Sequence, residues 1–187
     1  MTTTVLLIGL GNPGASYEKN RHNVGFRIVD AIVCAARGSF KRMASIVETA
    51  SFEIGDSRVI LAKPQTFMNL SGKAARFLVD FYKIPTENVC VFHDDIDLEF
   101  SQIKIKKGGG NGGHNGLKSI DAAIGVNYWR VRIGVGRPLY KSMVSDYVLG
   151  NFDTDQEKII DVIVVDMTKN ISALIENIKS GQYGRKN

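Results

Sequence analysis

Three short polar segments of this chain carry side chains that could bind or cleave a substrate. The first runs from Gly108 to Gly116, reads Gly-Gly-Gly-Asn-Gly-Gly-His-Asn-Gly, and carries the side chains of Asn111, His114 and Asn115. Glycine lets backbone N–H groups approach a substrate closely, at a cost in chain entropy that a plain linker has no reason to concentrate here. This segment is therefore expected to form one wall of a binding site.

The other two segments add a second histidine and further amides. Gly9-Leu-Gly-Asn-Pro-Gly14 is followed by His22-Asn23, and the third segment reads Phe67-Met68-Asn69-Leu70-Ser71-Gly72. Together the three segments predict one composite pocket, in which a histidine activates water, a carboxylate orients the histidine and amides position an acyl group. His22 and His114 are both candidates for the activating histidine.

The carboxylates that could orient this histidine lie in His93-Asp-Asp-Ile-Asp97, at the end of an expected buried strand. Strand ends of an open α/β sheet can meet in one crevice, so Asp94 or Asp95 could reach His22. The same segment is the densest cluster of potential metal ligands, and a metal-dependent hydrolase centred on it is a rival interpretation. Adjacent residues on a strand point to opposite faces, so at most part of this cluster can converge on one ion.

Other motifs argue against several classes of enzyme. Residues 9–14 match the G-x-G-x-x-G of dinucleotide-binding proteins, but residues 15–21 are a polar loop where that motif requires a helix. Asp30, the acid about twenty residues further on, falls within an expected helix instead of at a strand end. The chain has no Gly-Lys-Ser/Thr and no Gly-x-Ser-x-Gly, so a phosphate-loop NTPase and a covalent acyl-enzyme are not supported. Cys34 and Cys90 lie among aliphatic residues and are expected to be small buried hydrophobic residues.

Length and composition suit one globular domain. The chain has 187 residues, of which 44% are hydrophobic and 23% are charged, as in ordinary soluble proteins with a sizeable core. We expect a single domain over residues 1–187, ending in a loose basic tail at residues 182–187. The first residues lack the basic region of a signal peptide, and the apolar runs are too short to span a membrane, so the cytoplasm is the expected location.

The hydrophobic pattern alternates between strands and helices. We expect strands at residues 4–9, 46–54, 58–62, 89–92, 101–107 and 128–135, and helices at residues 24–36, 71–82, 116–124 and 154–179. Ser71 is expected to cap the helix that it begins. The long last helix is expected to bury an apolar stripe of Ile159, Ile163, Met167, Ile171, Leu174 and Ile178. The expected fold class is α/β, with a mixed, mostly parallel twisted sheet covered by helices.

Two basic strands could bind a partner that carries phosphates, as the net charge of +5 permits. Strand alternation places Lys104 and Lys106 on one face of their strand, and Arg130 and Arg132 on one face of theirs. If these strands are neighbours, the four residues form a patch near the glycine segment, with Lys118 just beyond it. A solvated sheet face is the alternative, and the pattern by itself favours that alternative.

Taken together, these motifs resemble those of the bacterial-type peptidyl-tRNA hydrolase family. The resemblance rests on ordered blocks that span nearly the whole chain: Gly9-Leu-Gly-Asn-Pro-Gly14 with Tyr17 and Arg21-His-Asn-Val-Gly25, Lys63-Pro-Gln-Thr-Phe-Met-Asn-Leu-Ser-Gly72, His93-Asp-Asp-Ile-Asp-Leu98, residues 108–118, and Arg130-Val-Arg-Ile-Gly-Val-Gly136. Each glycine motif is weak alone, and their order and spacing carry the resemblance. Asn20 stands where the family often has threonine, and Glu99-Phe-Ser101 replaces a segment that usually carries proline and glycine.

The resemblance implies an enzyme that cleaves the ester between a peptide and the 3′-terminal ribose of tRNA. Such an enzyme recycles tRNA from abortive translation. The implied partner is peptidyl-tRNA, bound through its acceptor stem and 3′ end. Neither a cofactor nor a metal ion is implied, a membrane is not involved, and we expect a monomer in the cytoplasm.

The resemblance also assigns catalytic and substrate-binding residues by their positions in the motifs. His22 is the base that takes a proton from water, and Asp95 holds the other ring nitrogen of His22 and stabilises the imidazolium. The implied substrate-binding residues are Asn12, Tyr17, Met68, Asn69, His114 and Asn115. The three asparagines suit hydrogen bonds to the peptide backbone and the ester, because an amide donates and accepts without ionising. Met68 and Tyr17 would form apolar walls.

For the basic patch, the resemblance reverses the preference for a solvated face. Lys106 and Arg132 fall where the family gathers basic residues for the 5′-terminal phosphate of the acceptor stem. Lys104 is implied as a further phosphate-binding residue, with Arg130 and Lys118 as helpers through general attraction to the phosphate backbone.

A module that binds RNA without catalysis remains the rival from another class. Relatives of this fold work with RNA without being hydrolases, and a basic groove alone would serve that role. The intact His22, Asp95 and Asn12 argue against this alternative, since binding by itself does not need a base.

Overall fold

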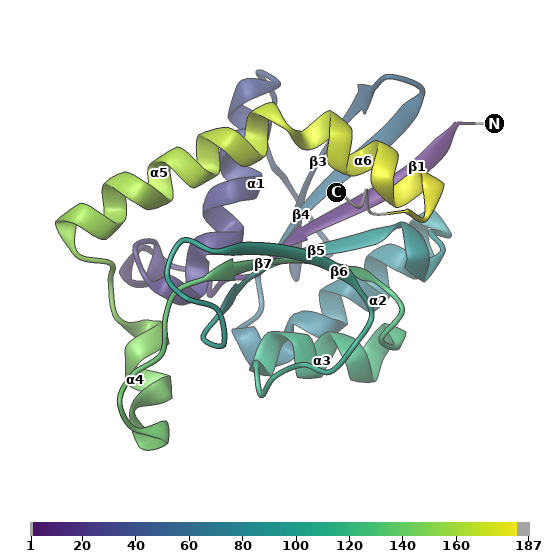
Figure 1. Cartoon of the computed structure of the whole chain (residues 1–187). Coiled ribbons are helices and arrows are strands. Elements are labelled where there is room, and N and C mark those ends of the chain that lie inside the picture. Colours follow the sequence, from purple (N-terminus) through teal and green to yellow (C-terminus); the bar gives the residue numbers. More distant parts are fainter. Residues whose placement is uncertain (1, 183–187) are drawn as a thin grey trace.

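The computed structural model describes residues 2–182, whose strands form one seven-stranded sheet (Figure 1). The strands are β1 (Thr3–Gly9), β2 (Lys41–Met43), β3 (Val47–Ile54), β4 (Ser57–Pro64), β5 (Val89–Asp95), β6 (Ile103–Lys107) and β7 (Trp129–Gly134). Their order across the sheet is β2-β3-β4-β1-β5-β7-β6. The central strands β4, β1, β5 and β7 run parallel, and the β2–β3, β3–β4 and β6–β7 pairs are antiparallel. The expected α/β fold with a mixed sheet is confirmed.

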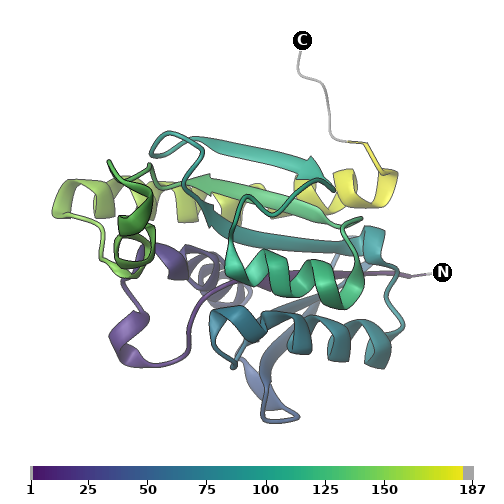
Figure 2. The ribbon, with the colours of Figure 1, turned by 90° about the horizontal axis from the view of Figure 1, so that it is seen from below.

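Helices cover both faces of this sheet (Figure 1, Figure 2). One face carries α1 (Val24–Ala35), α5 (Thr154–Lys169) and α6 (Ile171–Ser180), and the other carries α2 (Ser71–Tyr82) and α3 (Asn115–Ile124). The helix α4 (Val144–Leu149) stands apart from both layers, at the end of the sheet to which β7 leads. Short 3₁₀ turns lie at Ala15–Tyr17, Arg21–Asn23, Met68–Leu70, Thr86–Asn88 and Lys141–Met143.

Side chains that alternate along the central strands build two separate cores. Leu7 and Phe92 pack in the cluster that includes α1, α5 and α6, whereas Leu6 and Val91 pack in the cluster that includes α2 and α3. This is the two-residue repeat of an extended chain buried on both faces. The face on which a strand residue lies therefore decides which helical layer it meets.

The helix α2 covers the expected residues and ends ahead of Pro85, because the residue before a proline disfavours helical angles. Its start differs from expectation. Leu70 is the N-cap residue, and Ser71 is already helical, with its hydroxyl donating to the Met68 carbonyl at 2.8 Å. Ser71 is therefore not a cap.

The single long helix expected over residues 154–179 is two helices, α5 and α6, which are separated at Asn170. This residue leaves helical angles (φ −97°, ψ 9°), and its side-chain amide donates to the Asp166 carbonyl at 2.9 Å. Asparagine competes for backbone groups in this way and so favours helix ends. The apolar stripe shifts as well, because Ile160 is buried and Ile159 is exposed. The other buried members are Ile163, Ile171, Leu174 and Ile178, as expected, with Met167 packed against them.

Cys90 is buried, as expected, but Cys34 is exposed. The helix α1 buries Ile32 and Val33, and Cys34 lies about 100° further round the helix, toward solvent. Apart from Gln182, the expected basic tail lies outside the described residues. Within residues 2–182, no helix combines the length and apolar character needed to cross a membrane.

Residues 9–14 do not form a dinucleotide-binding turn. Gly14 (φ 110°) leads into a 3₁₀ turn, and α1 begins only at Val24, so no α-helix N-terminus stands at Gly14 to receive a pyrophosphate. Asp30 lies within α1, as expected, and pairs with Lys63 at 2.8 Å.

The start of α1 packs closely on the ends of β1 and β5 because Gly25 has no side chain. A Cβ at Gly25 would lie 2.3 Å from the Phe92 carbonyl oxygen and 2.5 Å from the Leu10 nitrogen. Only glycine permits this approach. The contact holds the turn Arg21–Asn23, which precedes α1, beside the carboxyl ends of the parallel strands.

Candidate active site

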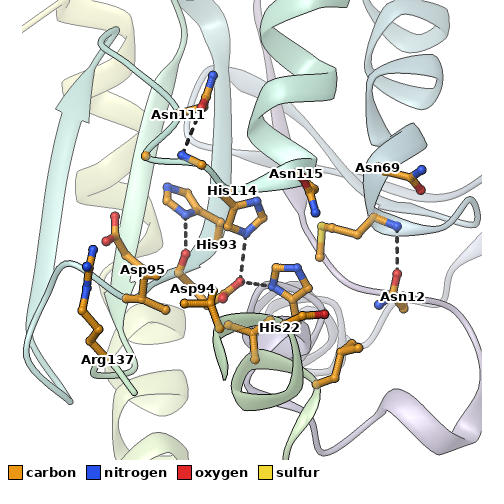
Figure 3. Close-up of a pocket in the computed structure, with 18 of the residues that line it drawn as sticks. Asn12, His22, Asn69, His93, Asp94, Asp95, Asn111, His114, Asn115 and Arg137 are labelled. Atoms are coloured by element: carbon orange, nitrogen blue, oxygen red, sulfur yellow. Dashed lines mark hydrogen bonds and ion pairs between the residues drawn. The ribbon is translucent and has the colours of Figure 1, made fainter. Parts of the chain in front are cut away.

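A cavity of about 790 Å³ lies at the carboxyl ends of the parallel strands, between the start of α3 and α4 (Figure 3). Ligand sites of open α/β sheets form at this edge. The cavity is lined by most of the residues singled out in the sequence: Asn12, His22, Met68, Asn69, Asp94, Asp95, Asn111, His114 and Asn115. The three polar segments therefore meet in one place, as expected.

Asp94 is the centre of the polar side of this cavity. The residue is 2% exposed, and its Oδ1 lies 2.8 Å from His22 Nδ1 and 2.9 Å from His114 Nε2 (Figure 3). Burial by itself raises the pKa of Asp94, but the charges and hydrogen bonds of the two histidines lower it well below its usual range. Asp94 is therefore an anion that accepts two imidazole N–H groups.

The hydrogen bonds of His114 determine which of its nitrogens carries the proton. His114 is the N-cap residue of α3, and its Nδ1 accepts from the N–H groups of Gly116 at 3.1 Å and Leu117 at 3.3 Å. An accepting Nδ1 carries no proton, so the proton is on Nε2, which donates to Asp94. His22 donates to the same carboxylate through Nδ1, which leaves the lone pair of the neutral ring on His22 Nε2.

His22 has the environment of a general base. The residue lines the cavity and is 8% exposed. Burial lowers the pKa of His22, but the charge of Asp94 and its hydrogen bond together outweigh burial and raise the pKa above 6.5. A histidine that lines a cavity beside a buried carboxylate is suited to proton abstraction.

Asp94, and not the predicted Asp95, holds His22. Along β5, Phe92 faces the layer that contains α1, and Asp94 lies on the same face. His22 immediately precedes α1, so the carboxylate on this face meets it. Asp95 lies on the opposite face, where its Oδ2 accepts from Arg132 Nε at 2.7 Å. The assignment of Asp95 as the partner of His22 is therefore wrong.

His93 does not share the properties of His22. It is buried, its Nδ1 donates to the Asp94 carbonyl at 2.7 Å, and its ring lies edge-on to His114 with 5.2 Å between centroids. Burial and the neighbouring His114 lower the pKa of His93 to about 3. His93 is therefore a buried, packed part of the cavity lining.

Asn12 is held so that only one end of its amide is free. Its Oδ1 accepts from the Met68 N–H at 2.8 Å. Asn23 fixes its backbone, because Asn23 Oδ1 accepts from the Asn12 N–H at 3.0 Å and Asn23 Nδ2 donates to the Asn12 carbonyl at 2.9 Å. Among residues 2–182 no group bonds to Asn12 Nδ2, which is a donor at the cavity wall. The supporting role of Asn23 was not predicted, although it directly follows His22.

Of the other predicted substrate-binding residues, Met68, Asn69 and Asn115 line the cavity and Tyr17 does not. Asn69 and Asn115 line the cavity, and none of the hydrogen bonds within residues 2–182 uses their side chains. Met68 lines it as a buried apolar side chain. Tyr17 does not line the cavity, because its turn places its ring edge-on against Phe67, with centroids 6.3 Å apart. Phe67 is the aromatic residue in the wall.

The far side of the cavity was not foreseen in the sequence. It consists of residues at the end of β5 and around α4, namely Ile96, Arg137, Lys141, Val144, Ser145, Val148 and Leu149. The helix α4 has six residues, too few to show a helical period in the sequence. Arg21 fastens it beside His22, since its guanidinium donates to the Tyr147 carbonyl at 3.2 Å and lies 4.3 Å from the centre of the Tyr147 ring.

The basic strands β6 and β7 are neighbours, which is the condition for the basic patch. Lys104 pairs with Arg132 and Lys106 with Arg130 in the antiparallel register of β6 and β7, and opposite residues share a face. Burial and then the positive charges of Arg132 and Arg130 lower the pKa of Lys106. The crowding of like charge favours an anion at this face.

Arg130 is not available to an external partner. Its side chain is fully buried, with Nη2 2.9 Å from Asp121 Oδ1 and Nη1 donating to the Gly110 carbonyl. The expectation for Arg130 was general attraction to the phosphate backbone, and its burial leaves it no direct contact with a phosphate. Lys118 is exposed on α3.

His22, Asp94 and His114 also have a spacing that could hold a metal ion, since one ligand atom of each lies within 4.8 Å of the others. This set is not the cluster of residues 93–97 considered in the sequence, from which it takes only Asp94. In the structure both imidazoles hydrogen-bond to the same carboxylate oxygen.

Comparisons with known proteins point to one family. The sequence model of the peptidyl-tRNA hydrolase family matches residues 6–185. The chain is 48% identical over 178 residues to a peptidyl-tRNA hydrolase of Rickettsia bellii (strain RML369-C), covering 92% of this chain and 94% of that protein. It is 45% identical over 186 residues to a peptidyl-tRNA hydrolase of Sulfurimonas denitrificans, with 98% of each chain covered. The crystal structure of a peptidyl-tRNA hydrolase from Acinetobacter baumannii superposes with a TM-score of 0.89 at 34% identity, covering 95% of this chain and 91% of that one.

Proposed function

The chain belongs to the peptidyl-tRNA hydrolase family, and on this premise we propose that it cleaves the ester between a peptide and the 3′-terminal ribose of tRNA with a water molecule deprotonated by His22. The observation that carries this mechanism is the His22–Asp94 hydrogen bond, which leaves the lone pair of His22 Nε2 available in the cavity. A module that only binds RNA has no use for such a base.

The reaction uses the histidine twice. His22 Nε2 takes a proton from water while the water oxygen bonds to the ester carbonyl carbon, which gives a tetrahedral intermediate. Asp94 stabilises the resulting imidazolium across 2.8 Å. The bond between the carbonyl carbon and the ribose oxygen then breaks, and the imidazolium returns its proton to that oxygen. Water is the nucleophile, so no acyl-enzyme forms.

The amides bind the acyl group. Asn12 Nδ2, fixed by the Met68 N–H on the other end of its amide, donates to an oxygen of the ester or the adjacent peptide. Asn69 and Asn115 bind the peptide backbone, Met68 and Phe67 contact its side chains, and Tyr17 supports Phe67 from outside the cavity. His114 donates a hydrogen bond to Asp94. It therefore supports the base, His22, and does not bind substrate.

The decisive experiment compares a tRNA that carries an N-acetylated amino acid with the same tRNA carrying the free amino acid, both with a chelator present. We expect the N-acetylated ester to be hydrolysed at least about 100-fold faster, because a free ammonium group cannot accept the hydrogen bonds that an acyl group accepts. Release of tRNA, followed on gels, measures both rates. Equal cleavage of the two substrates would refute the specificity, and loss of activity with chelator would show that a metal ion takes part.

Lys104, Lys106 and Arg132 bind phosphates of the acceptor stem, with Lys106 and Arg132 on the 5′-terminal phosphate. Three cations on one sheet face beside the cavity favour this role, and Arg132 connects the face to the site through Asp95. The enzyme acts as a monomer in the cytoplasm, where stalled translation supplies its substrate.

Replacing Lys106 with alanine is expected to weaken tRNA binding and to lower the slope of log affinity against log salt by about one, since one phosphate contact is lost. Lys107→Ala is the matched control. It removes the same charge from the next residue, whose ammonium lies 5.8 Å from the Trp129 ring centre on the opposite face of β6. Binding measured across a salt series would contradict the assignment if both variants changed the slope equally.

A further inference from the structure

The glycine segment carries His114 but has little that could fix its own path. Gly108, Gly109, Gly112 and Gly113 all have positive φ, between 58° and 97°. Such residues have no side chains to pack, so the segment depends on a few specific bonds for its position. Gly108 is held by its N–H, which donates to the Tyr128 carbonyl at 2.9 Å, and His114 is held by the start of α3. Between these two ends, the bonds converge on one buried ion pair.

This ion pair is formed by Arg130 of β7 and Asp121 of α3. The Asp121 carboxylate accepts from Arg130 Nη2 at 2.9 Å and from the Tyr128 hydroxyl at 2.6 Å. The Arg130 guanidinium also lies 4.6 Å from the Tyr128 ring centre. A fully buried guanidinium is costly unless it is paired in this way. The pair is therefore a fixed point in the fold.

Two bonds attach the glycine segment to this point. Arg130 Nη1 donates to the Gly110 carbonyl, and the Asn111 side-chain amide donates to Asp121 Oδ2 at 3.2 Å. The other end of that amide accepts from the Gly113 N–H at 3.1 Å, and the Asn111 carbonyl accepts from the His114 N–H at 2.9 Å. Asn111 thus joins the ion pair to the residue that donates to Asp94.

We propose that Asn111, anchored by Asp121 and Arg130, is a positioning residue for catalysis that holds His114 on the Asp94 carboxylate and so sets how strongly Asp94 acts on His22. This inference rests on the proposed function of His22. Asn111 touches neither His22 nor Asp94 by a hydrogen bond in the described part of the chain, and its effect passes through His114.

The expected sign follows from the shared carboxylate oxygen. The N–H of His114 offsets part of the negative charge of Asp94 that His22 experiences. When His114 is released, Asp94 favours the imidazolium of His22 more strongly, and the rise of activity with pH moves to higher pH. Besides Asp94 and His114, the titratable or charged residues that line the same cavity are His93, Asp95, Arg137 and Lys141.

The test compares Asn111→Ala with Gly110→Ala. The first variant removes both bonds of the Asn111 amide, and the buried ion pair stays intact. The second adds a methyl group to the same segment where no atom lies within 4 Å of it, and φ there is not positive. We expect Asn111→Ala to lower kcat about tenfold, because Asp94 without the His114 hydrogen bond orients His22 less precisely, with KM within about twofold. The acid limb of kcat/KM should move to higher pH, and Gly110→Ala should behave as the native protein.

A double-mutant cycle with His114→Ala completes the test. If Asn111 acts through His114, Asn111→Ala has no further effect on kcat in the His114→Ala background. Additive losses would overturn the inference, and so would an unchanged kcat or an unshifted pH limb in Asn111→Ala. Failure of the proposed function is a separate result, since the native protein would then show no hydrolysis of N-acetylated aminoacyl-tRNA.

Discussion

Replacing His22 with asparagine is expected to lower kcat for N-acetylated aminoacyl-tRNA by about 10³-fold, within the range that general bases contribute. The asparagine amide can still donate to Asp94, as His22 Nδ1 does at 2.8 Å, but it offers no base at the position of Nε2. Binding of deacylated tRNA should stay within about twofold, because the residues proposed to bind phosphates are unchanged. Single-turnover kinetics and equilibrium binding measure the two effects separately.

A retained rate in His22→Asn would contradict this prediction. If His22→Asn retained its rate, the base would have to be another group, and His114 and His93 are the remaining histidines of the chain. His114 uses both ring nitrogens in hydrogen bonds, and burial and His114 lower the pKa of His93 to about 3. A retained rate would therefore contradict the whole arrangement and not just one residue.

The pH profile gives the same prediction a second measurement. In the proposed mechanism hydrolysis needs neutral His22, whose pKa is raised from the usual 6.5 because the charge and hydrogen bond of Asp94 outweigh burial. The rate is therefore low when His22 is protonated and rises as pH increases through this raised pKa. In His22→Asn the residual rate should lack this rise.

Replacing Asp94 with asparagine is expected to lower kcat by about 10²- to 10⁴-fold, as for the carboxylate of other base-activating pairs. The buried His22 loses the negative charge that stabilises its imidazolium, and burial then lowers its pKa. The acid limb of the pH profile should move to lower pH, opposite in sign to the shift expected for Asn111→Ala. Steady-state kinetics would measure the fall in kcat and the shift of the acid limb. The pH should run from about 5 to about 9, a range that spans the reference pKa of histidine.

Asp95→Asn is the matched control, since it makes the same change at the next residue. Asp95 accepts from Arg132 Nε at 2.7 Å, on the face of β5 away from His22. Its loss should change kcat by less than about threefold and act mainly on tRNA binding, through Arg132. The reverse order, with Asp95→Asn the slower enzyme, would restore Asp95 as the partner of His22.

Much of the fold was predictable because the pattern that specifies it is local. The ranges of β1, α1 and α2 agree with expectation within one residue at each end, since apolar spacing within about a dozen neighbouring residues distinguishes strand from helix. Two helix predictions failed for reasons that apolar spacing does not report. Asn170 interrupts a continuous helical pattern with its own side chain, and α4 is too short to show a period.

The membership of the site was also largely predictable, whereas its connections were not. The predicted residues that line the cavity are Asn12, His22, Asn69, His114 and Asn115. They could be predicted because each is a polar residue in or near a glycine-rich segment. Their hydrogen-bond partners depend on distant parts of the chain. Arg130 appeared to be a surface cation from strand alternation, and only the position of α3 and Asp121 makes it a buried one.

The residue pattern alone was enough to identify the α/β class, the family, and most of the polar residues on one side of the cavity. Only the tertiary structure decided that Asp94 and not Asp95 meets His22, a contact between residues 72 positions apart. The physical reason is that adjacent strand residues face opposite sides of the sheet, so the choice between them depends on which side α1 covers. That side is set by how the whole chain crosses over the sheet, and no local pattern of residues encodes it.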